Sequence, residues 1–416
     1  MRKYLNLEPL QNAKKKTQII YAWNYIEWGG AQIYYFALIK GVKKEFDVKI
    51  VLPENSDEQL LNFIRALDIP YEFIHTQADS KPVPTLKRKL ERHLNKFKSE
   101  DVLLKYLQKF DLKNSIVHIE LAPWQSLFSL MRLSRQTRVF ITAHNSLPPA
   151  PKWRNLLWSI KFKTIAKFKN FHMFCSNEDS KNYFRQFFPA RFVENNINVT
   201  YTSVNPIEID EALSAEFDRA EICRKFNISD NKFLVLCVGQ FIDRKGRWTF
   251  MEAAKKVCEV TDDIVFAWIS NSKPSAEDIQ KAEDFGLGEK FRLITADQIG
   301  GGRIDLLKMF RLADVFVLAS FVEGLPISLL EAMALGIPSI STNVNAIPEA
   351  VKHLETGILI EAGDASKLTE SILLLKSDED LRKKISKNGR DWVLTNFDER
   401  EVARIAMAAY KKSLAV

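Results

Sequence analysis

The chain has 416 residues, of which 46% are hydrophobic and 27% charged, and its net charge is +8. This is the composition of an ordinary globular protein, and the length predicts two or three domains. No apolar run approaches the roughly 18 residues of a membrane-spanning helix, and the N-terminal residues contain no apolar signal-peptide core. We therefore expect a cytoplasmic protein, and an integral membrane protein is excluded.

The charge is distributed unevenly between the two halves. Residues 1–205 carry 32 Lys and Arg against 18 Asp and Glu, whereas residues 206–416 carry 28 against 34. A basic half attracts anionic partners, such as a membrane surface, a lipid-phosphate-linked glycan or a nucleic acid. Because no nucleic-acid-binding motif is present and the positive charge is confined to one half, we expect no nucleic-acid partner.

Short apolar runs alternate with helical patterns along most of the chain, which predicts β-α-β units and mainly parallel sheets. The expected strands are 17–23, 48–52, 116–119, 139–143 and 172–175, followed by 233–238, 264–269, 315–318, 339–341 and 358–360. Turn residues near Val204-Asn205-Pro206 mark the boundary between the two sets. We predict domains over residues 1–204 and 205–396, each large enough for its own core, followed by a last helical segment over 397–416.

Two features of the first half follow predicted strands. Gly29 and Gly30 come after the first strand and before a helical pattern, where glycines let the backbone approach a ligand closely. His144 comes after strand 139–143, and strand C-termini are where α/β sheets place ligands. An ordinary turn and a structural histidine remain the alternatives. The G-x-G-x-x-G fingerprint of a dinucleotide site is absent, which argues against an NAD-dependent oxidoreductase.

The first half also contains two basic segments. Residues 151–170 contain no acid, and Trp153, Leu157, Ile160 and Ile165 alternate there with lysines. Residues 81–98 are basic as well. Such segments predict contact with an anionic membrane surface, although an ordinary helix with one buried and one solvated face has the same composition.

The second half opens with a basic turn. Arg244 and Lys245 lie shortly after strand 233–238 and directly before Gly246, at the expected start of a helix. A lysine beside a helix N-terminus is well placed to neutralise a diphosphate. A solvated basic turn is the alternative.

The most informative segment is F-V-E-G-L-P-I-S-L-L-E-A-M-A-L-G-I-P-S-I-S-T, residues 321–342. Glu323 falls in a loop, and residues 327–335 read as a short helix that ends at Gly336 and carries Glu331. A helix N-terminus lies between the two acids and is a natural seat for phosphate. Two hydroxyl-binding acids around a phosphate seat would suit a nucleotide-sugar. A buried helix with one solvated loop acid is the alternative.

This segment resembles the Glu-x7-Glu signature of retaining, nucleotide-sugar-dependent glycosyltransferases with the GT-B fold, especially glycosyltransferase family 4. The residues that match in register are Ser320, Glu323, Gly324, Leu325, Pro326, Glu331, Ala332, Ala334, Gly336, Pro338, Ile340 and Thr342, followed by Pro348, Glu349 and 357–360. The resemblance implies two Rossmann-like domains that face a cleft, with the C-terminal helix crossing back to the first domain. It is strong in the second half and weak between residues 55 and 135.

The resemblance also implies roles at the donor site. Glu331 would hold the ribose hydroxyls, and Glu323 would contact hydroxyls of the donor sugar. Gly324 and the backbone at Leu325, Pro326 and Ile327 would face the sugar or the phosphates.

Other positions would act on the leaving group and on the sugar. Lys245, with Arg244 beside it, would stabilise the departing diphosphate, while Gln240 occupies the position of the family's usual arginine. Gly29 and Gly30 would let the opposite domain close, and His144 would orient the sugar.

We therefore expect a metal-independent enzyme without a cofactor. It would transfer a sugar, most commonly from a UDP-sugar in this family, to a glycan, lipid-linked or protein acceptor in cell-surface polysaccharide or glycoconjugate synthesis. The work would take place in the cytoplasm or on the inner face of the membrane. The main alternative is a non-catalytic GT-B subunit that directs a partner enzyme. A GT-B epimerase or phosphorylase and a nucleic-acid binder are weaker alternatives.

Overall fold

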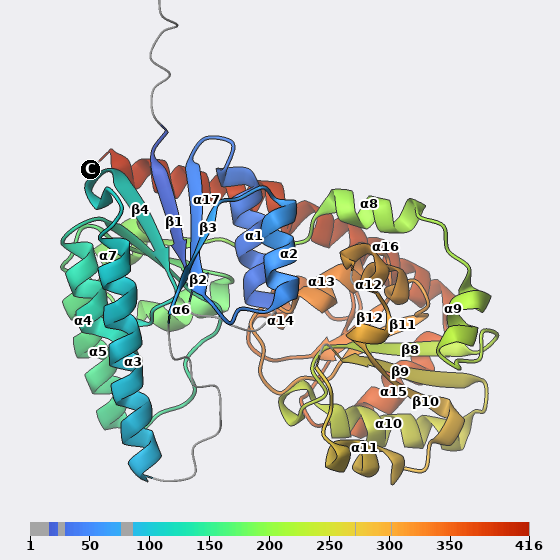
Figure 1. The fold of residues 1–416 in the computed structure, drawn as a ribbon. Helices are drawn as coiled ribbons and strands as arrows, with labels where there is room; N and C mark the ends of the chain where they lie inside the picture. Colours follow the sequence, from blue (N-terminus) through green and yellow to red (C-terminus); the bar gives the residue numbers. More distant parts are fainter. Residues whose placement is uncertain (1–15, 24–29, 76–85, 271, 301, 416) are drawn as a thin grey trace, which may run out of the picture.

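The computed structural model describes residues 16–23, 30–75, 86–270, 272–300 and 302–415. Two parallel sheets form the framework, each covered by helices (Figure 1). This is the two-domain, Rossmann-like α/β arrangement that the sequence predicts. The strands of the first sheet all precede residue 200 and those of the second all follow residue 232, on either side of the predicted boundary.

The first sheet has the strand order β3-β2-β1-β4-β5-β6-β7. Its strands are β1 Gln18–Ala22, β2 Asp47–Pro53, β3 Tyr71–Ile74, β4 Ser115–Ile119, β5 Arg138–Ala143, β6 Phe171–Cys175 and β7 Ile197–Val199. Its helices are α1 Gly30–Val42, α2 Glu58–Ala66, α3 Leu86–Leu107, α4 Pro123–Ser134, α5 Lys152–Ile165, α6 Glu178–Arg185 and α7 Ala190–Asn196. Strands buried on both faces need continuous apolar runs, which is how these strands read in the sequence.

The second sheet has the strand order β10-β9-β8-β11-β12-β13. Its strands are β8 Phe233–Val238, β9 Ile264–Ser270, β10 Phe291–Thr295, β11 Val315–Leu318, β12 Ser339–Thr342 and β13 Ile358–Ile360. Its helices are α8 Pro206–Ser214, α9 Arg219–Lys225, α10 Arg247–Val260, α11 Ala276–Glu283, α12 Arg303–Phe310, α13 Ile327–Ala334, α14 Ile347–Ala350, α15 Ala365–Ser377 and α16 Glu379–Asn396.

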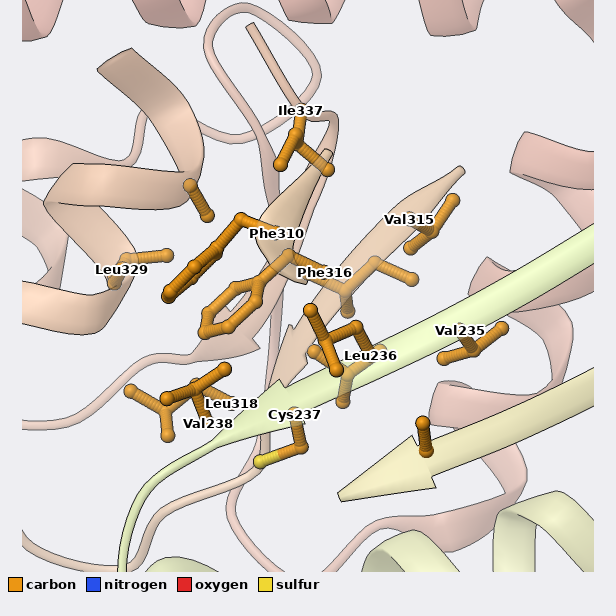
Figure 2. Packing of buried hydrophobic residues seen from close by; sticks show 14 of the residues in the cluster. Val235, Leu236, Cys237, Val238, Phe310, Val315, Phe316, Leu318, Leu329 and Ile337 are labelled. Atoms are coloured by element: carbon orange, nitrogen blue, oxygen red, sulfur yellow. The ribbon is translucent and has the colours of Figure 1, made fainter. Parts of the chain in front are cut away.

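The core of the second domain fixes the strand that leads into the acidic loop. Figure 2 shows labelled side chains of β8 and β11 packed together, with Leu329 of α13 to one side of them. Phe310 and Phe316 stack with ring centroids 5.7 Å apart. Because β11 is fully buried, its end, and therefore the start of the loop that carries Glu323, has little freedom to move.

The C-terminal helix α17, Glu399–Leu414, packs on the first domain, as predicted, and lies beside α1 (Figure 1). The contact is so close that a Cβ atom on Gly41 would lie 2.4 Å from Cβ of Ala403. Near the helix end the buried Tyr410 hydroxyl is 2.6 Å from Nδ1 of His118 and 3.2 Å from the Tyr21 hydroxyl. The last helix is therefore anchored within the first domain's core.

Acid should weaken the first domain through His118. Burial lowers the pKa of this imidazole from its ordinary value of 6.5 to about 3. The stability that this difference contributes is complete above pH 6.5 and is lost as the pH falls toward 3, at up to about 1.4 kcal/mol per pH unit. We expect the free energy of unfolding, measured by urea denaturation between pH 7 and 4.5, to fall less steeply in His118→Asn than in the wild type. Equal slopes would contradict this assignment.

Candidate donor site in the cleft

The centre of the candidate site is a buried ion pair between Lys245 and Glu323. The two side chains are 13% and 6% exposed, and Nζ of Lys245 lies 2.5 Å from Oε1 of Glu323. The same carboxylate oxygen accepts a hydrogen bond of 2.6 Å from the Ser320 hydroxyl. The structure therefore brings the predicted leaving-group cation and the predicted sugar-binding acid together, although 78 positions separate them in the sequence.

Backbone geometry explains why the two loops meet. Gly246 is the N-cap residue of α10 and has φ of +72°, and a Cβ atom there would clash with the carbonyl oxygen of Ala319. Only glycine tolerates both the left-handed conformation and this approach. The amide of Phe321 donates a hydrogen bond of 2.9 Å to the carbonyl of Arg244, which joins the basic turn to the acidic loop.

Arg244 lies at the edge of this pair. Its guanidinium donates to the carbonyl of Val322 at 2.9 Å and lies 3.5 Å from Oε2 of Glu323, and the side chain is 45% exposed. Arg244 is thus a second cation beside Lys245. Gln240 occupies the position at which the family signature has an arginine. Both cations converge on one carboxylate, so an incoming anionic group would find two positive charges near the same point.

The helix that carries the second acid begins as predicted. Pro326 is the N-cap residue of α13, and the helix ends at Ala334, before Gly336 with φ of +77°. Pro326 has no backbone N–H, so among Leu325, Pro326 and Ile327 only the first and the last can donate a backbone hydrogen bond. The amides of Ile327 and Ser328, the first two residues of α13, have no acceptor within the helix, so this helix end can bind an anionic group.

Glu331 is 2% exposed and contacts the guanidinium of Arg303, at the start of α12. Arg303 also lies 3.5 Å from Oε2 of Glu208 on α8, which binds Lys40 of α1 at 2.9 Å. Lys40 in turn lies 3.3 Å from Glu399 of α17. A chain of ion pairs therefore connects the predicted ribose acid with both domains. The sequence analysis missed Arg303, Glu208 and Lys40, because nothing in their local patterns indicates that they meet.

A cavity of about 610 Å³ opens beside Arg303 between the two domains. The second domain contributes the ends of β9 and β10 and the glycines before α12, while α2 of the first domain forms the opposite wall. The lining includes Asn62, Phe63, Ser270, Thr295, Gly302 and Arg303. Its place outside the carboxyl ends of parallel strands is where open α/β sheets bind ligands, and its volume falls in the range of small-molecule sites.

The domains contact one another on the other side of the acidic loop. A Cβ atom on Gly324 would lie 2.4 Å from the carbonyl oxygen of His144, and one on Gly30 would lie 4.0 Å from Cγ2 of Ile327. The predicted glycines on both sides are therefore contact points between the domains. Gly29 lies outside the described residues.

A further contact between the domains involves Glu349 of α14. Its carboxylate accepts hydrogen bonds from the amides of Glu178, at 3.0 Å, and Asp179, at 2.8 Å, at the start of α6. Burial raises the pKa of Glu349, and these two amide donors oppose that rise. The second domain thus caps a helix of the first.

His144 follows β5 and lies behind Gly324. Its ring contacts Tyr34 and Tyr35 edge-on, with centroids 5.0 and 6.0 Å away, and burial lowers its pKa to about 4. The imidazole is therefore neutral at pH 7. Among the described residues its Nε2 atom is buried without a hydrogen-bond partner. A neutral histidine with one free nitrogen can orient a hydroxyl group but carries no charge to the site.

Known proteins that are similar in sequence include several glycosyltransferases. A profile of the family described as Glycosyl transferases group 1 matches residues 218–392. The chain is 24% identical, over 93% of its length and 98% of the relative, to an N,N'-diacetylbacillosaminyl-diphospho-undecaprenol alpha-1,3-N-acetylgalactosaminyltransferase of Campylobacter jejuni. It is 29% identical, over 47% of its length and 50% of the relative, to a UDP-Gal:alpha-D-GlcNAc-diphosphoundecaprenol alpha-1,3-galactosyltransferase of Escherichia coli.

Solved structures share the fold over nearly the whole chain. A glycosyltransferase from Rickettsia africae matches with a TM-score of 0.76 at 19% identity, covering 96% of this chain and 99% of that one. The Anabaena protein HepE, solved in complex with UDP, matches with a TM-score of 0.72 at 13% identity, covering 95% and 99%. The group 1 glycosyltransferase profile thus covers most of the second domain, and the chain has the two-domain, Rossmann-like GT-B fold.

Proposed function

We propose that the protein transfers a hexose from a nucleotide-sugar, with UDP as the preferred nucleotide, to a lipid-linked glycan, and that the sugar keeps its anomeric configuration. The observation that carries the proposal is the buried Lys245–Glu323 pair beside the N-terminus of α13. Lys245, Arg244 and the α13 amides would receive the diphosphate, while Glu323 and His144 would bind hydroxyls of the sugar. This stabilisation of the leaving group involves no metal ion.

The nucleoside would occupy the 610 Å³ cavity, with its ribose toward Glu331. In the closed arrangement the contacts at Gly324 and Gly30 would exclude water from the anomeric carbon and limit hydrolysis of the donor. The choice of UDP is supported by the UDP complex of the Anabaena structure and by the UDP-Gal donor in the name of the E. coli relative.

The acceptor class is supported by the relatives. The names of the C. jejuni and E. coli proteins both specify a sugar on diphospho-undecaprenol. An acceptor with a prenyl diphosphate is anionic and membrane-bound, which fits the positive charge of residues 1–205. We place the reaction in polysaccharide or glycoconjugate synthesis on the cytoplasmic face of the membrane.

A transfer assay tests this proposal. The protein would be incubated with single nucleotide-sugars and a prenyl-diphosphate-linked monosaccharide, and the product's new linkage would be assigned by NMR. We expect one donor to give a product with the anomeric configuration of that donor. An inverted product would contradict retention. Donor binding without transfer to any acceptor would favour the non-catalytic subunit, for which Gln240 in place of arginine is the supporting observation.

A further inference from the structure

Helix α5 presents apolar side chains on two opposite faces. Trp158, Phe162 and Ile165 are buried against the core of the first domain. On the opposite face Trp153, Leu156, Leu157 and Ile160 are 60%, 63%, 47% and 54% exposed. The exposed four follow the i, i+3, i+4, i+7 spacing, so they form one stripe along the helix. We call these four residues the α5 stripe.

A surface helix of a globular protein needs only one apolar face, and a second one marks an interaction site. Phe128 on the neighbouring helix α4 is 76% exposed and adds to the apolar surface of this part of the molecule. The α5 stripe is therefore a candidate binding surface, and the charge of the neighbouring residues indicates which class of partner it binds.

The sequence segment that contains the α5 stripe carries only positive charge. Residues 121–177 contain nine Lys and Arg and no Asp or Glu. Helical periodicity places Lys152 and Lys163 along one side of the stripe and Arg154 and Lys161 along the other. The exposed Lys167 and Lys169 follow directly after the helix. An apolar stripe flanked by cations matches the acyl–headgroup boundary of an anionic bilayer.

The lysine content favours lipid over a protein partner. Protein interfaces are depleted in lysine, whereas anionic headgroups attract it. Among the helices of the described ranges, none combines the length and apolar character needed to cross a bilayer, so contact with lipid would be made from the surface.

The position of the stripe relates it to the candidate site. The chain passes from His144 to the first residue of α5, Lys152, in eight positions, and the stripe begins at the next residue. The four residues of the stripe thus lie in the N-terminal turns of α5, the end of the helix that follows the segment after His144. A lipid-linked acceptor held in the same bilayer would meet the cleft from this side.

We propose that the α5 stripe and its flanking cations dock the protein on an anionic membrane surface. This proposal rests on the proposed function in one respect: docking would bring a lipid-linked acceptor to the cleft. The docking itself depends on apolar area and positive charge, not on glycosyl transfer.

Flotation of the full-length protein with vesicles tests the docking. Vesicles of phosphatidylcholine alone would be compared with vesicles that contain phosphatidylglycerol, at low and high salt. We expect binding only to the anionic vesicles, and expect the variant Leu156→Ser/Leu157→Ser/Ile160→Ser to bind at least about tenfold more weakly. A matched control is Ile207→Ser/Val260→Ser, which removes side chains that are 66% and 68% exposed in the second domain. This control should bind vesicles like the wild type.

The outcomes separate this proposal from the proposed function. Because the substituted residues are exposed and outside the cleft, affinity for a soluble nucleotide-sugar should not change in either variant, and thermal unfolding should confirm that both are folded. Failure of the wild type to bind anionic vesicles would overturn the docking proposal, as would unchanged binding in the stripe variant. Vesicle binding by a protein that binds no nucleotide-sugar would leave docking intact and overturn the proposed function. Self-association through the stripe, without vesicle binding, would assign the surface to a second copy of the chain.

Discussion

Replacing Lys245 by methionine should lower kcat/KM for sugar transfer by two to three orders of magnitude. Methionine keeps the length of the side chain but removes its charge, so the diphosphate would leave without its nearest cation. Loss of one group that stabilises developing negative charge in a closed site typically costs about 10²- to 10³-fold in rate. Release of the nucleoside diphosphate, followed at saturating acceptor, measures the effect.

The Lys245 variant also leaves Glu323 with one fewer partner. The Glu323 side chain is 6% exposed, and among the described residues its carboxylate would retain Ser320 and the more distant Arg244 as partners in the variant. Thermal unfolding must therefore be compared with activity, and the rate measured well below the melting temperature. Lys256→Met on α10, which removes a partly exposed lysine paired with Glu252, is the matched control and should keep wild-type activity. A Lys245 variant as active as this control would remove the leaving-group role.

Replacing Glu331 by alanine should weaken donor binding about a hundredfold. The carboxylate would accept hydrogen bonds from two ribose hydroxyls, and hydrogen bonds to a charged group contribute about 1.5–3 kcal/mol each. Calorimetric titration with the donor measures the loss. Glu331→Gln should give a smaller loss, because an amide oxygen still accepts a hydrogen bond.

The contact between Glu331 and Arg303 means that the Glu331 variant must also be checked for stability. Glu331 contacts Arg303, and the ribose must share or replace that contact. Alanine would leave the largely buried Arg303 with Glu208 as its remaining acidic neighbour, 3.5 Å away, so some loss of stability is expected. Melting temperatures without donor show whether lower affinity merely reflects partial unfolding. Glu283→Ala, at an exposed position of α11, is the control, and donor affinity in Glu331→Ala equal to that in this control would contradict the ribose assignment.

Much of the framework could be predicted from the sequence, because buried parallel strands require continuous apolar runs. The predicted strands 233–238, 315–318 and 358–360 coincide with β8, β11 and β13. The three strands that were not predicted, β3, β7 and β10, all lie at sheet edges. An edge strand pairs on one side only and tolerates polar residues, as in Y-E-F-I of β3, so its apolar pattern is weak.

Some residues of the candidate site could likewise be predicted from the sequence, and others could not. Glu323, Glu331 and Lys245 are identifiable because their spacing to glycine and proline is local and resembles a known family signature. Arg303 and Lys40 are not, because their roles arise from ion pairs between segments that are distant in the sequence and brought together only by the fold. The proposed membrane contact of residues 151–170 depends on which face of α5 is buried, and composition alone does not give that.

Titration of the metal-free protein with UDP-, GDP-, ADP- and TDP-sugars, with NAD as a control, tests most directly whether the cleft is a nucleotide-sugar site. We predict saturable, one-to-one binding of one nucleotide-sugar, with UDP as the preferred nucleotide, and no binding of NAD. The affinity should fall about a hundredfold in Glu331→Ala and stay unchanged in Glu283→Ala. A folded protein that binds none of these donors would contradict the account and favour a GT-B subunit without catalytic activity.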